Sequence, residues 1–222
     1  MFSRTELLIG DKINILKKSN IIVFGIGGVG GYVAEMLVRS GIENITLVDF
    51  DMVDLSNLNR QIIALHSTIG KYKVDVMKDR LLDINNNCNI KVFNEKLTPD
   101  NLGIFNLNDY DYIIDAIDMI QSKVALIDYA YKNNLKIISA MGAGNRFDIP
   151  EFKVVDIYDT YNDGLSKILR SHLRKLGITK HNVVFTSNKP NKIAENIGSI
   201  VYYPAMCGCV LSAYVINDLI KE

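Results

Sequence analysis

The segment from Ile21 to Gly31, IIVFGIGGVGG, restricts the fold of this chain more than any other. Apolar residues run directly into the pattern Gly25-x-Gly27-x-x-Gly30, and the helix-compatible run YVAEMLVRSG follows. A buried strand, a glycine turn and a helix N-terminus in this order make up a nucleotide-binding βαβ unit. The glycines let the backbone turn tightly and approach a phosphate, while free N–H groups at the helix start favour an anion. The segment therefore predicts a nucleotide site.

An acidic residue occupies the position that a ribose-binding carboxylate takes in such units. The next apolar strand, ITLV, ends at Asp49, about 20 residues beyond the glycine turn. A glycine pattern alone is a weak signal, but the strand, the helix and the acid together indicate nucleotide binding. The competing interpretation is a tight turn that only packs a helix on a sheet.

Composition favours one α/β domain over residues 1–222. The chain has 222 residues, 48% of them hydrophobic, which suffices for a substantial core. We expect a Rossmann-like, doubly wound, mostly parallel sheet with helices on both faces. The nucleotide-binding core should cover about residues 20–145, and a C-terminal portion for substrate or dimer contacts about 146–222.

Charge and cysteine content restrict the cellular location and the kinds of binding partner that we expect for this protein. With 25 basic and 25 acidic residues the chain has no global basic field for nucleic acid, although a local patch remains open. Three cysteines are too few for a disulfide framework, and charges within the first six residues argue against a secretory signal. No apolar run approaches the roughly 20 residues that span a bilayer. We expect a cytoplasmic protein that does not enter a membrane.

A long polar segment separates the Asp49 strand from the next helix. It reads DFDMVDLSNLNRQIIALHSTIGKYK, whereas an ordinary connection has about 2 to 6 residues. Its charged and amide side chains include those of Asp49, Asp51, Asn57, Asn59, Arg60, Gln61 and Lys73. Planar donors and a movable lysine charge beside the glycine turn suit a triphosphate. The alternative is a solvated Ω-loop.

Carboxylates follow a later strand, YDYIIDAID, which ends in Asp115 and Asp118. Ligands of open parallel sheets lie beyond the carboxyl ends of strands, and a carboxylate facing a phosphate there is a natural Mg²⁺ ligand. Asp118 could instead cap the helix expected from Lys123 to Tyr131. The strand KIISAM leads into Gly142-Ala-Gly144 at the same rim, which suggests close backbone approach to a ligand.

Several further elements are expected from the pattern. We predict an amphipathic helix over residues 3–18, with Leu7, Leu8, Ile13 and Leu16 on its inner side. A second helix should start at Thr98-Pro99-Asp100, a basic helix should carry Lys167, Arg170, Arg174 and Lys175, and an apolar helix should end the chain. The remaining candidates for chemistry, interpreted as structural, surface or small core residues, are His66, His172, His181, Cys207 and Cys209.

Four motifs together match a known family: GIGGVG, ITLVDFDMVDLSNLNRQ, GKYKVDVMKDRLLDINNN and DAID. Over nearly its whole length the chain resembles the adenylating domain shared by ubiquitin-activating E1 enzymes, ThiF and MoeB. Within that family FSRTELLIG, DYDYIIDAID, Lys123 and SAMGAGNRFDIPEFKVVDIYDT are most similar to the tRNA threonylcarbamoyladenosine dehydratase branch. The two CxxC pairs usual in the ThiF and MoeB branch are absent.

The resemblance implies ATP and Mg²⁺ as cofactors and a role for each site residue. Asp118 would bind Mg²⁺ and, with Arg60 and Lys73, support catalysis. Arg4 would reach a nucleotide phosphate in the partner subunit of a homodimer. The residues implied to hold the nucleotide are Gly25, Gly27, Gly28, Gly30, Asp49, Asp51, Asn57, Asn59 and Gln61.

The implied reaction is the ATP-dependent adenylation of a carboxylate. In the dehydratase branch this is the threonylcarbamoyl carboxylate on adenosine 37 of tRNA, which then cyclises with loss of water. The alternative is an adenylyltransferase that activates the C-terminus of a ubiquitin-like sulfur carrier, with a sulfur-relay partner. A short segment without cysteine, SNKPNKIAENIGS, replaces the insertion that relatives carry before the last helix, so the tRNA contacts stay open.

Overall fold

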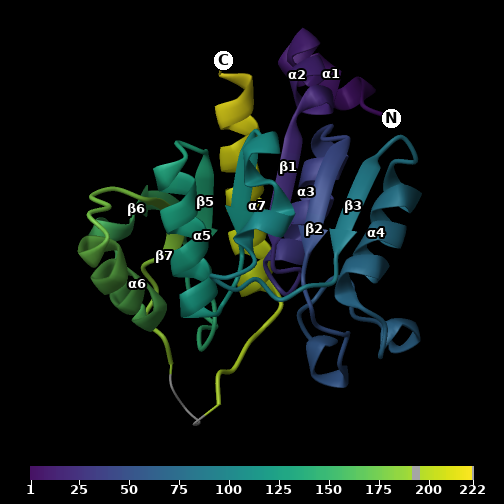
Figure 1. Cartoon of the computed structure of the whole chain (residues 1–222). Coiled ribbons are helices and arrows are strands. Elements are labelled where there is room, and N and C mark those ends of the chain that lie inside the picture. The colour runs from purple at the N-terminus through teal and green to yellow at the C-terminus, as the bar shows by residue number, and fades with distance from the viewer. Residues whose placement is uncertain (192–195, 222) are drawn as a thin grey trace.

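A seven-stranded sheet runs through the middle of the molecule (Figure 1). The structure, a computed structural model, describes residues 1–191 and 196–221. The strands are β1 (Asn20–Phe24), β2 (Asn44–Val48), β3 (Asn89–Phe93), β4 (Tyr112–Asp115), β5 (Ile137–Ala140), β6 (Phe152–Asp156) and β7 (Asn182–Thr186). The central strands are nearly continuous runs of isoleucine, valine and leucine because both of their faces are covered.

The strand order is β3-β2-β1-β4-β5-β7-β6. All neighbouring pairs are parallel except β6 and β7, which are antiparallel. The chain reverses its direction of winding between β1 and β4, where Phe24 is in register with Asp115. This arrangement confirms the predicted doubly wound, mostly parallel sheet, and it places a topological switch point beyond β1 and β4.

Helices cover both faces of the sheet, as predicted. The α-helices are α1 (Ser3–Ile9), α2 (Ile13–Lys18), α3 (Gly30–Ser40), α4 (Lys73–Ile84), α5 (Ile120–Lys132), α6 (Gly164–Lys175) and α7 (Tyr202–Ile220). Short 3₁₀ turns are η1 (Gly10–Lys12), η2 (Leu55–Asn57), η3 (His66–Thr68), η4 (Leu102–Phe105), η5 (Leu107–Asp109) and η6 (Ile157–Asp159). One buried cluster joins α2, α3, α4 and α7 to the sheet, and the other joins α5 and α6 to its opposite face.

The long helix α7 corrects one expectation from the sequence. By length and composition alone this 19-residue helix could cross a membrane, whereas no such run was expected. In the structure 44% of its most apolar stretch is buried, and it packs on α3 and on the strands. Cys207 and Leu211 are fully buried in that contact. Its apolar character is therefore that of a core helix.

The predicted helix over residues 3–18 is wrong in its middle. Gly10 has a φ of +57° and ends α1, so η1 separates α1 from α2. Ile13 and Leu16 of α2 are buried as expected, but Leu7 and Leu8 of α1 are 81% and 86% exposed. The apolar stripe does not continue across Gly10 because its positive φ interrupts the helical backbone that would carry it.

The helix expected at Thr98 does not form either. The side chain of Asn101 accepts a hydrogen bond from the Thr98 backbone N–H at 2.8 Å and donates one to the Lys96 carbonyl at 2.9 Å. These local bonds close a turn and compete with helix formation, and the 3₁₀ turns η4 and η5 follow. Phe105 from η4 fills the space beneath this face of the sheet, between Phe24 and Phe93.

Candidate active site

A cavity of about 460 Å³ opens at the switch point, beyond the carboxyl ends of β1 and β4. Its walls come from the glycine turn after β1, the polar segment after β2, the loop after β4 and the Gly142–Gly144 loop after β5. Parallel strands end at one edge of a sheet, so segments far apart in the sequence meet there. The apolar part of the wall includes Phe24, Val48, Leu97, Ile117 and Met119.

The glycine turn is possible only with glycine at two positions. Gly25 has a φ of +85°, and a Cβ there would lie 2.7 Å from the Ala116 carbonyl oxygen. A Cβ on Gly30 would lie 1.7 Å from the Gly25 carbonyl oxygen, so this glycine lets α3 pack directly on the turn. Gly25, Gly27 and Gly28 line the cavity, whereas Gly30 lies behind it. In the first turn of α3, the N–H groups of Gly31 and Val33 donate to the Gly27 and Val29 carbonyls at 3.1 and 3.0 Å.

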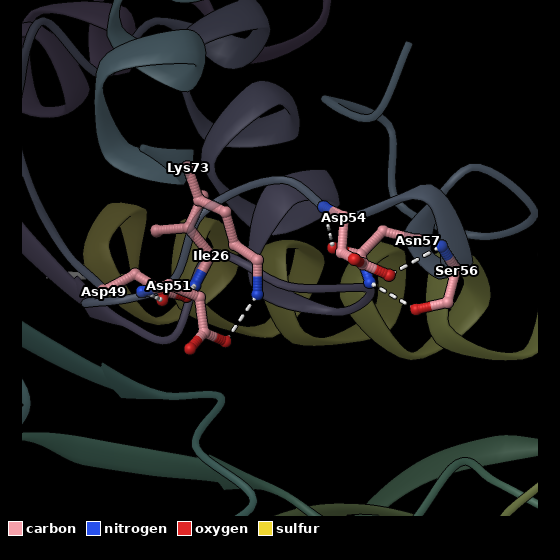
Figure 2. Close-up of polar contacts among 7 residues, drawn as sticks. All are labelled: Ile26, Asp49, Asp51, Asp54, Ser56, Asn57 and Lys73. Carbon is pink, nitrogen blue, oxygen red and sulfur yellow. Dashed lines mark hydrogen bonds and ion pairs between the residues drawn. The ribbon is translucent and has the colours of Figure 1, made fainter. Parts of the chain in front are cut away.

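Asp49 joins the end of β2 to the glycine turn. Its Oδ2 accepts the Ile26 backbone N–H at 2.6 Å, and its Oδ1 accepts the Asp51 backbone N–H at 2.9 Å (Figure 2). Burial raises the pKa of Asp49 above its ordinary value, an effect that the Asp51 hydrogen bond and the charge of Lys73 oppose. A carboxylate has about four acceptor positions, so this side chain can still accept hydroxyl groups from a ribose.

Lys73 reaches the cavity from the first residue of α4. Figure 2 shows its ammonium directed toward Asp51, and the two charged groups are 2.7 Å apart. The lysine side chain is 7% exposed and that of Asp51 is 48% exposed. The carboxylate thus holds the ammonium at the cavity wall, where an anionic ligand could take over the contact.

The polar segment after β2 is ordered by its own side chains. Asp54 and Asn57 cap η2 reciprocally, which leaves Asn57 buried at the cavity wall (Figure 2). Arg60 lines the cavity and donates to the Ser56 carbonyl at 2.7 Å. These contacts contradict the alternative of a merely solvated loop, because the segment presents defined donors to the cavity.

Two amides of this segment have different positions. Asn59 lies outside the cavity lining and donates to the Ser199 carbonyl at 2.9 Å, which ties the segment to the start of α7. Gln61 lines the cavity, and its buried Oε1 has no hydrogen-bond partner within the described residues. An unpaired buried acceptor costs free energy, so this atom is a place where a ligand donor would be favourable.

Asp118 is exposed at the cavity wall in the loop after β4. The alternative that it caps the following helix is wrong, because α5 has Met119 at its N-cap and no side-chain cap bond. Among the described residues no three His, Cys, Asp or Glu side chains gather as a metal site. A single carboxylate is nevertheless compatible with Mg²⁺, which commonly uses one or two carboxylates together with substrate phosphates.

A buried polar network supports the loop that carries Asp118. Lys123 of α5 and Asp115 at the end of β4 form an ion pair of 2.7 Å in which neither side chain is exposed. Asp115 also accepts the Ile117 N–H at 3.1 Å and the Ser139 hydroxyl at 2.6 Å. Because that hydroxyl gives its single proton to Asp115, Nε2 of His181, 2.8 Å away, must be the donor to Ser139. Burial lowers the pKa of His181 to about 3, so the imidazole is neutral.

Arg146 joins the Gly142–Gly144 loop of the cavity wall to segments of the C-terminal portion. Its side chain is buried, and its Nε donates to the Asn188 carbonyl at 2.8 Å. Its two terminal nitrogens donate to the carbonyls of Gly142, Gly144 and Asn162 at 2.9 to 3.1 Å. One guanidinium therefore fixes three separate segments of backbone. The segment GAGNRFD contributes to the family resemblance, but no spacing rule identifies its arginine as the residue that joins the three segments.

The cavity wall carries more carboxylates than cationic side chains. Two cations, Arg60 and Lys73, face the carboxylates of Asp49, Asp51, Glu95 and Asp118 among the described residues. Arg4 does not contribute within one chain, because it is exposed on α1, beyond the opposite ends of the strands (Figure 1). A polyphosphate at this wall would need further positive charge from a metal ion or from another chain.

The sheet and the cavity define a doubly wound nucleotide-binding domain with an elaborated phosphate side. This chain belongs to the ThiF family, whose family model matches residues 4–221. It is 38% identical to a Bacillus subtilis protein named tRNA threonylcarbamoyladenosine dehydratase, over all of this chain and 95% of that protein. It is 40% identical to the Escherichia coli protein of the same name, over 81% of this chain and 68% of that protein. A crystal structure of the E. coli dehydratase in complex with ATP superposes with a TM-score of 0.93, at 33% identity and over 99% and 93% of the two chains.

Proposed function

We propose that this protein is an ATP-dependent dehydratase that adenylates the threonylcarbamoyl carboxylate on adenosine 37 of tRNA and promotes its cyclisation. The observation that carries the proposal is the likeness over 99% of the chain to a dehydratase crystallised with ATP. The cavity at the switch point, with its glycine turn and its acid after β2, supports the same ligand. The chain is 38% identical to the Bacillus subtilis dehydratase, compared with 30% to a Porphyra purpurea protein named probable molybdopterin-synthase adenylyltransferase.

In this proposal ATP lies with its ribose at Asp49 and its phosphates along Gly25, Gly27 and Gly28. The apolar wall beside Asp49 would take the adenine, and the donors Arg60 and Lys73 would face the phosphates. Lys73 would exchange its contact with Asp51 for a phosphate oxygen. Gln61 and Asn57 would supply amide contacts from the same wall, while Gly30 and Asn59 would act indirectly by holding the turn and the loop.

The chemistry needs positive charge and position more than a protein nucleophile. A carboxylate oxygen of the substrate attacks the α-phosphorus of ATP, the bond to the bridging oxygen breaks, and pyrophosphate leaves. Arg60 and Lys73 would stabilise the charge that develops on the leaving group. A nitrogen of the modification then attacks the acyl carbon and releases its proton, and AMP leaves with the C–O electron pair and the former carboxylate oxygen. The closed ring therefore differs from the starting nucleoside by one water.

The excess of carboxylates at the cavity wall supports two further parts of the proposal. Mg²⁺ at Asp118 would neutralise phosphate charge when bound. A homodimer would bring Arg4 of one subunit to the phosphates of the other. Leu7 and Leu8, exposed beside Arg4 on α1, are the apolar surface that a second copy of the chain would cover. We infer a cytoplasmic location, as the substrate class requires.

The alternative substrate is the C-terminus of a ubiquitin-like sulfur carrier. Relatives named adenylyltransferase and sulfurtransferase are 34–36% identical over 51–58% of this chain. The paired cysteines usual in that branch are missing, since the chain has three cysteines in all. The described cysteines are free thiols, two of them buried, which favours the dehydratase reaction.

The test is turnover by the purified protein. Wild-type protein, ATP and Mg²⁺ are incubated with tRNA from a strain that lacks the dehydratase, and nucleosides are analysed by mass spectrometry. We expect a product lighter by one water. Lys73→Ala and Asp118→Asn should lower the rate on the order of 10² to 10³ while the fold is kept. Unchanged tRNA, together with adenylation of a sulfur-carrier C-terminus, would refute the proposal in favour of the alternative.

The subunit arrangement is tested by mixing two inactive variants. Arg4→Ala and Lys73→Ala chains, combined at equal amounts and allowed to exchange, should recover roughly a quarter of the wild-type sites, because half of the dimers then hold one intact site. No recovery from exchanged chains, or a monomer by sedimentation, would contradict the homodimer.

A further inference from the structure

The segment from 164 to 180 is a local exception to the neutral charge of the chain. It contains five lysine and arginine residues and no aspartate or glutamate, whereas the whole chain has 25 of each sign. Most of the segment is the helix α6. Because the chain as a whole is neutral, the excess of positive charge in this segment cannot be explained by overall composition and is a property of this part of the surface.

The structure separates an apolar and a basic face of α6. Leu169 and Leu173 are fully buried against the sheet, while Lys167, Arg174 and Lys175 are exposed. None of the ion pairs among residues 1–191 and 196–221 involves a basic residue of this segment. Within the described residues, these basic side chains therefore have no carboxylate at ion-pair distance.

Two of the guanidinium groups are held in place. Arg170 donates to the Thr160 carbonyl at 2.7 Å, and the Arg174 guanidinium lies 5.2 Å from the centre of the Tyr158 ring. Each arginine has donors left after these contacts, since a guanidinium carries five. Arginines that are already oriented lose less side-chain entropy when they bind phosphate than free ones do.

The basic helix begins at the cavity. Asp163 caps α6 and also accepts the Gly142 N–H at 2.9 Å, so the helix start is bonded to the cavity rim. Leu165 in the first turn lines the cavity, and Lys167 is exposed two residues later. From there α6 extends about 18 Å along the outer edge of the molecule (Figure 1). If the modified nucleotide of the tRNA lies at the cavity, the backbone phosphates on either side of it would be within reach of this helix.

We infer that the exposed face of α6, with Lys167, Arg174 and Lys175, binds the phosphate backbone of the tRNA beside the modified nucleotide. The inference rests on the proposed function, because it takes the substrate of the cavity to be a polyanion. Contacts of this kind position a nucleic acid without reading its sequence. They release counterions, so each one adds about 0.9 to the slope of log affinity against log salt.

The experiment compares Lys167→Gln/Lys175→Gln with the control pair Lys12→Gln/Lys91→Gln. The control lysines are exposed too, but Lys12 lies in η1 and Lys91 on the opposite edge strand β3. Binding of t⁶A-containing tRNA is measured by fluorescence anisotropy from 50 to 200 mM salt. Nucleoside analysis gives kcat and KM, and ATP binding and thermal unfolding verify each protein.

The α6 pair should weaken tRNA binding roughly 10-fold at 150 mM salt and lower the salt slope by about 2. KM for tRNA should rise, while ATP affinity and kcat at saturating tRNA stay as in the wild type. The control pair should keep the wild-type slope. If the wild type binds and cyclises tRNA but the α6 pair keeps its affinity and slope, the role of α6 is overturned alone. If the wild type neither binds nor cyclises tRNA, the proposed function fails, and the inference falls with it.

Discussion

Replacing Lys123 by methionine tests whether the buried ion pair under the cavity is a structural requirement. Among the described residues Lys123 is the only side-chain cation bonded to Asp115, and both side chains are fully buried. Removing one partner of a fully buried pair leaves an uncompensated charge and typically costs about 3 to 5 kcal/mol of unfolding free energy. In a domain of this size each kcal/mol lowers the unfolding midpoint by about 2–4 °C. We therefore expect a fall of about 6–20 °C by calorimetry or circular dichroism.

The matched control is Lys132→Met on the same helix. Lys132 pairs with Asp128 one turn away, but its side chain is 70% exposed, and such pairs contribute about 0.3–0.5 kcal/mol. The unfolding midpoint of Lys132→Met should fall by at most about 2 °C. The variant Asp115→Asn/Lys123→Met should cost less than the sum of its two single changes, because no charge is left unpaired. If Lys123→Met costs no more than Lys132→Met, the argument from buried charge is wrong.

Three further predictions concern the turn, a histidine and a thiol. Gly30→Ala should abolish ATP binding measured by calorimetry, since its Cβ would overlap the Gly25 carbonyl oxygen, whereas Gly103→Ala, which meets no atom within 4 Å, should bind normally. Burial lowers the pKa of His181 from 6.5 to about 3, so between these pH values the unfolded state binds a proton that the folded state does not. The free energy of unfolding should therefore fall as the pH drops from 6.5 toward 3, by up to about 1.4 kcal/mol per pH unit. Urea titrations of His181→Gln should lack this part of the pH dependence. Burial raises the pKa of the Cys207 thiol to about 12, so iodoacetamide at pH 8 should label it only in unfolded protein, as mass spectrometry would reveal.

The sheet and its switch point could be predicted because their signals are local and repeated. Each central strand is a short apolar run bounded by glycine, asparagine or aspartate, and the glycine turn has a fixed spacing to Asp49. Parallel strands then bring the ends of β1 and β4 to one place, so the location of the cavity follows from topology. The same reasoning predicts that Asp118 and Lys73 lie at the cavity, where the structure has both.

Two predicted helices are wrong because local contacts compete with helix formation, and other contacts could not be predicted because they join residues far apart in the sequence. Gly10 ends the first helix although the helical spacing of apolar residues continues past it in the sequence. The Asn101 side chain bonds the Thr98 N–H and closes a turn where Thr98 and Pro99 predict a helix. The bond between Ser139 and His181 joins residues 42 positions apart, and no spacing rule connects them. Such pairs depend on which strands become neighbours, which the sequence fixes only through the whole fold.

The bonds of Arg146 have a consequence for how this protein can change over evolutionary time. Loops around an active site usually vary one at a time, since each is anchored by its own strand ends. Here one guanidinium bonds the backbone of the segments at 142–144, 162 and 188, so a length change in any of them disturbs the other two. These three segments, the first of which lines the cavity, should therefore diverge as a unit, with coordinated replacements. The polar segment after β2 takes no part in these four bonds; it is capped by its own Asp54 and Asn57 and is linked to Ser199 through Asn59.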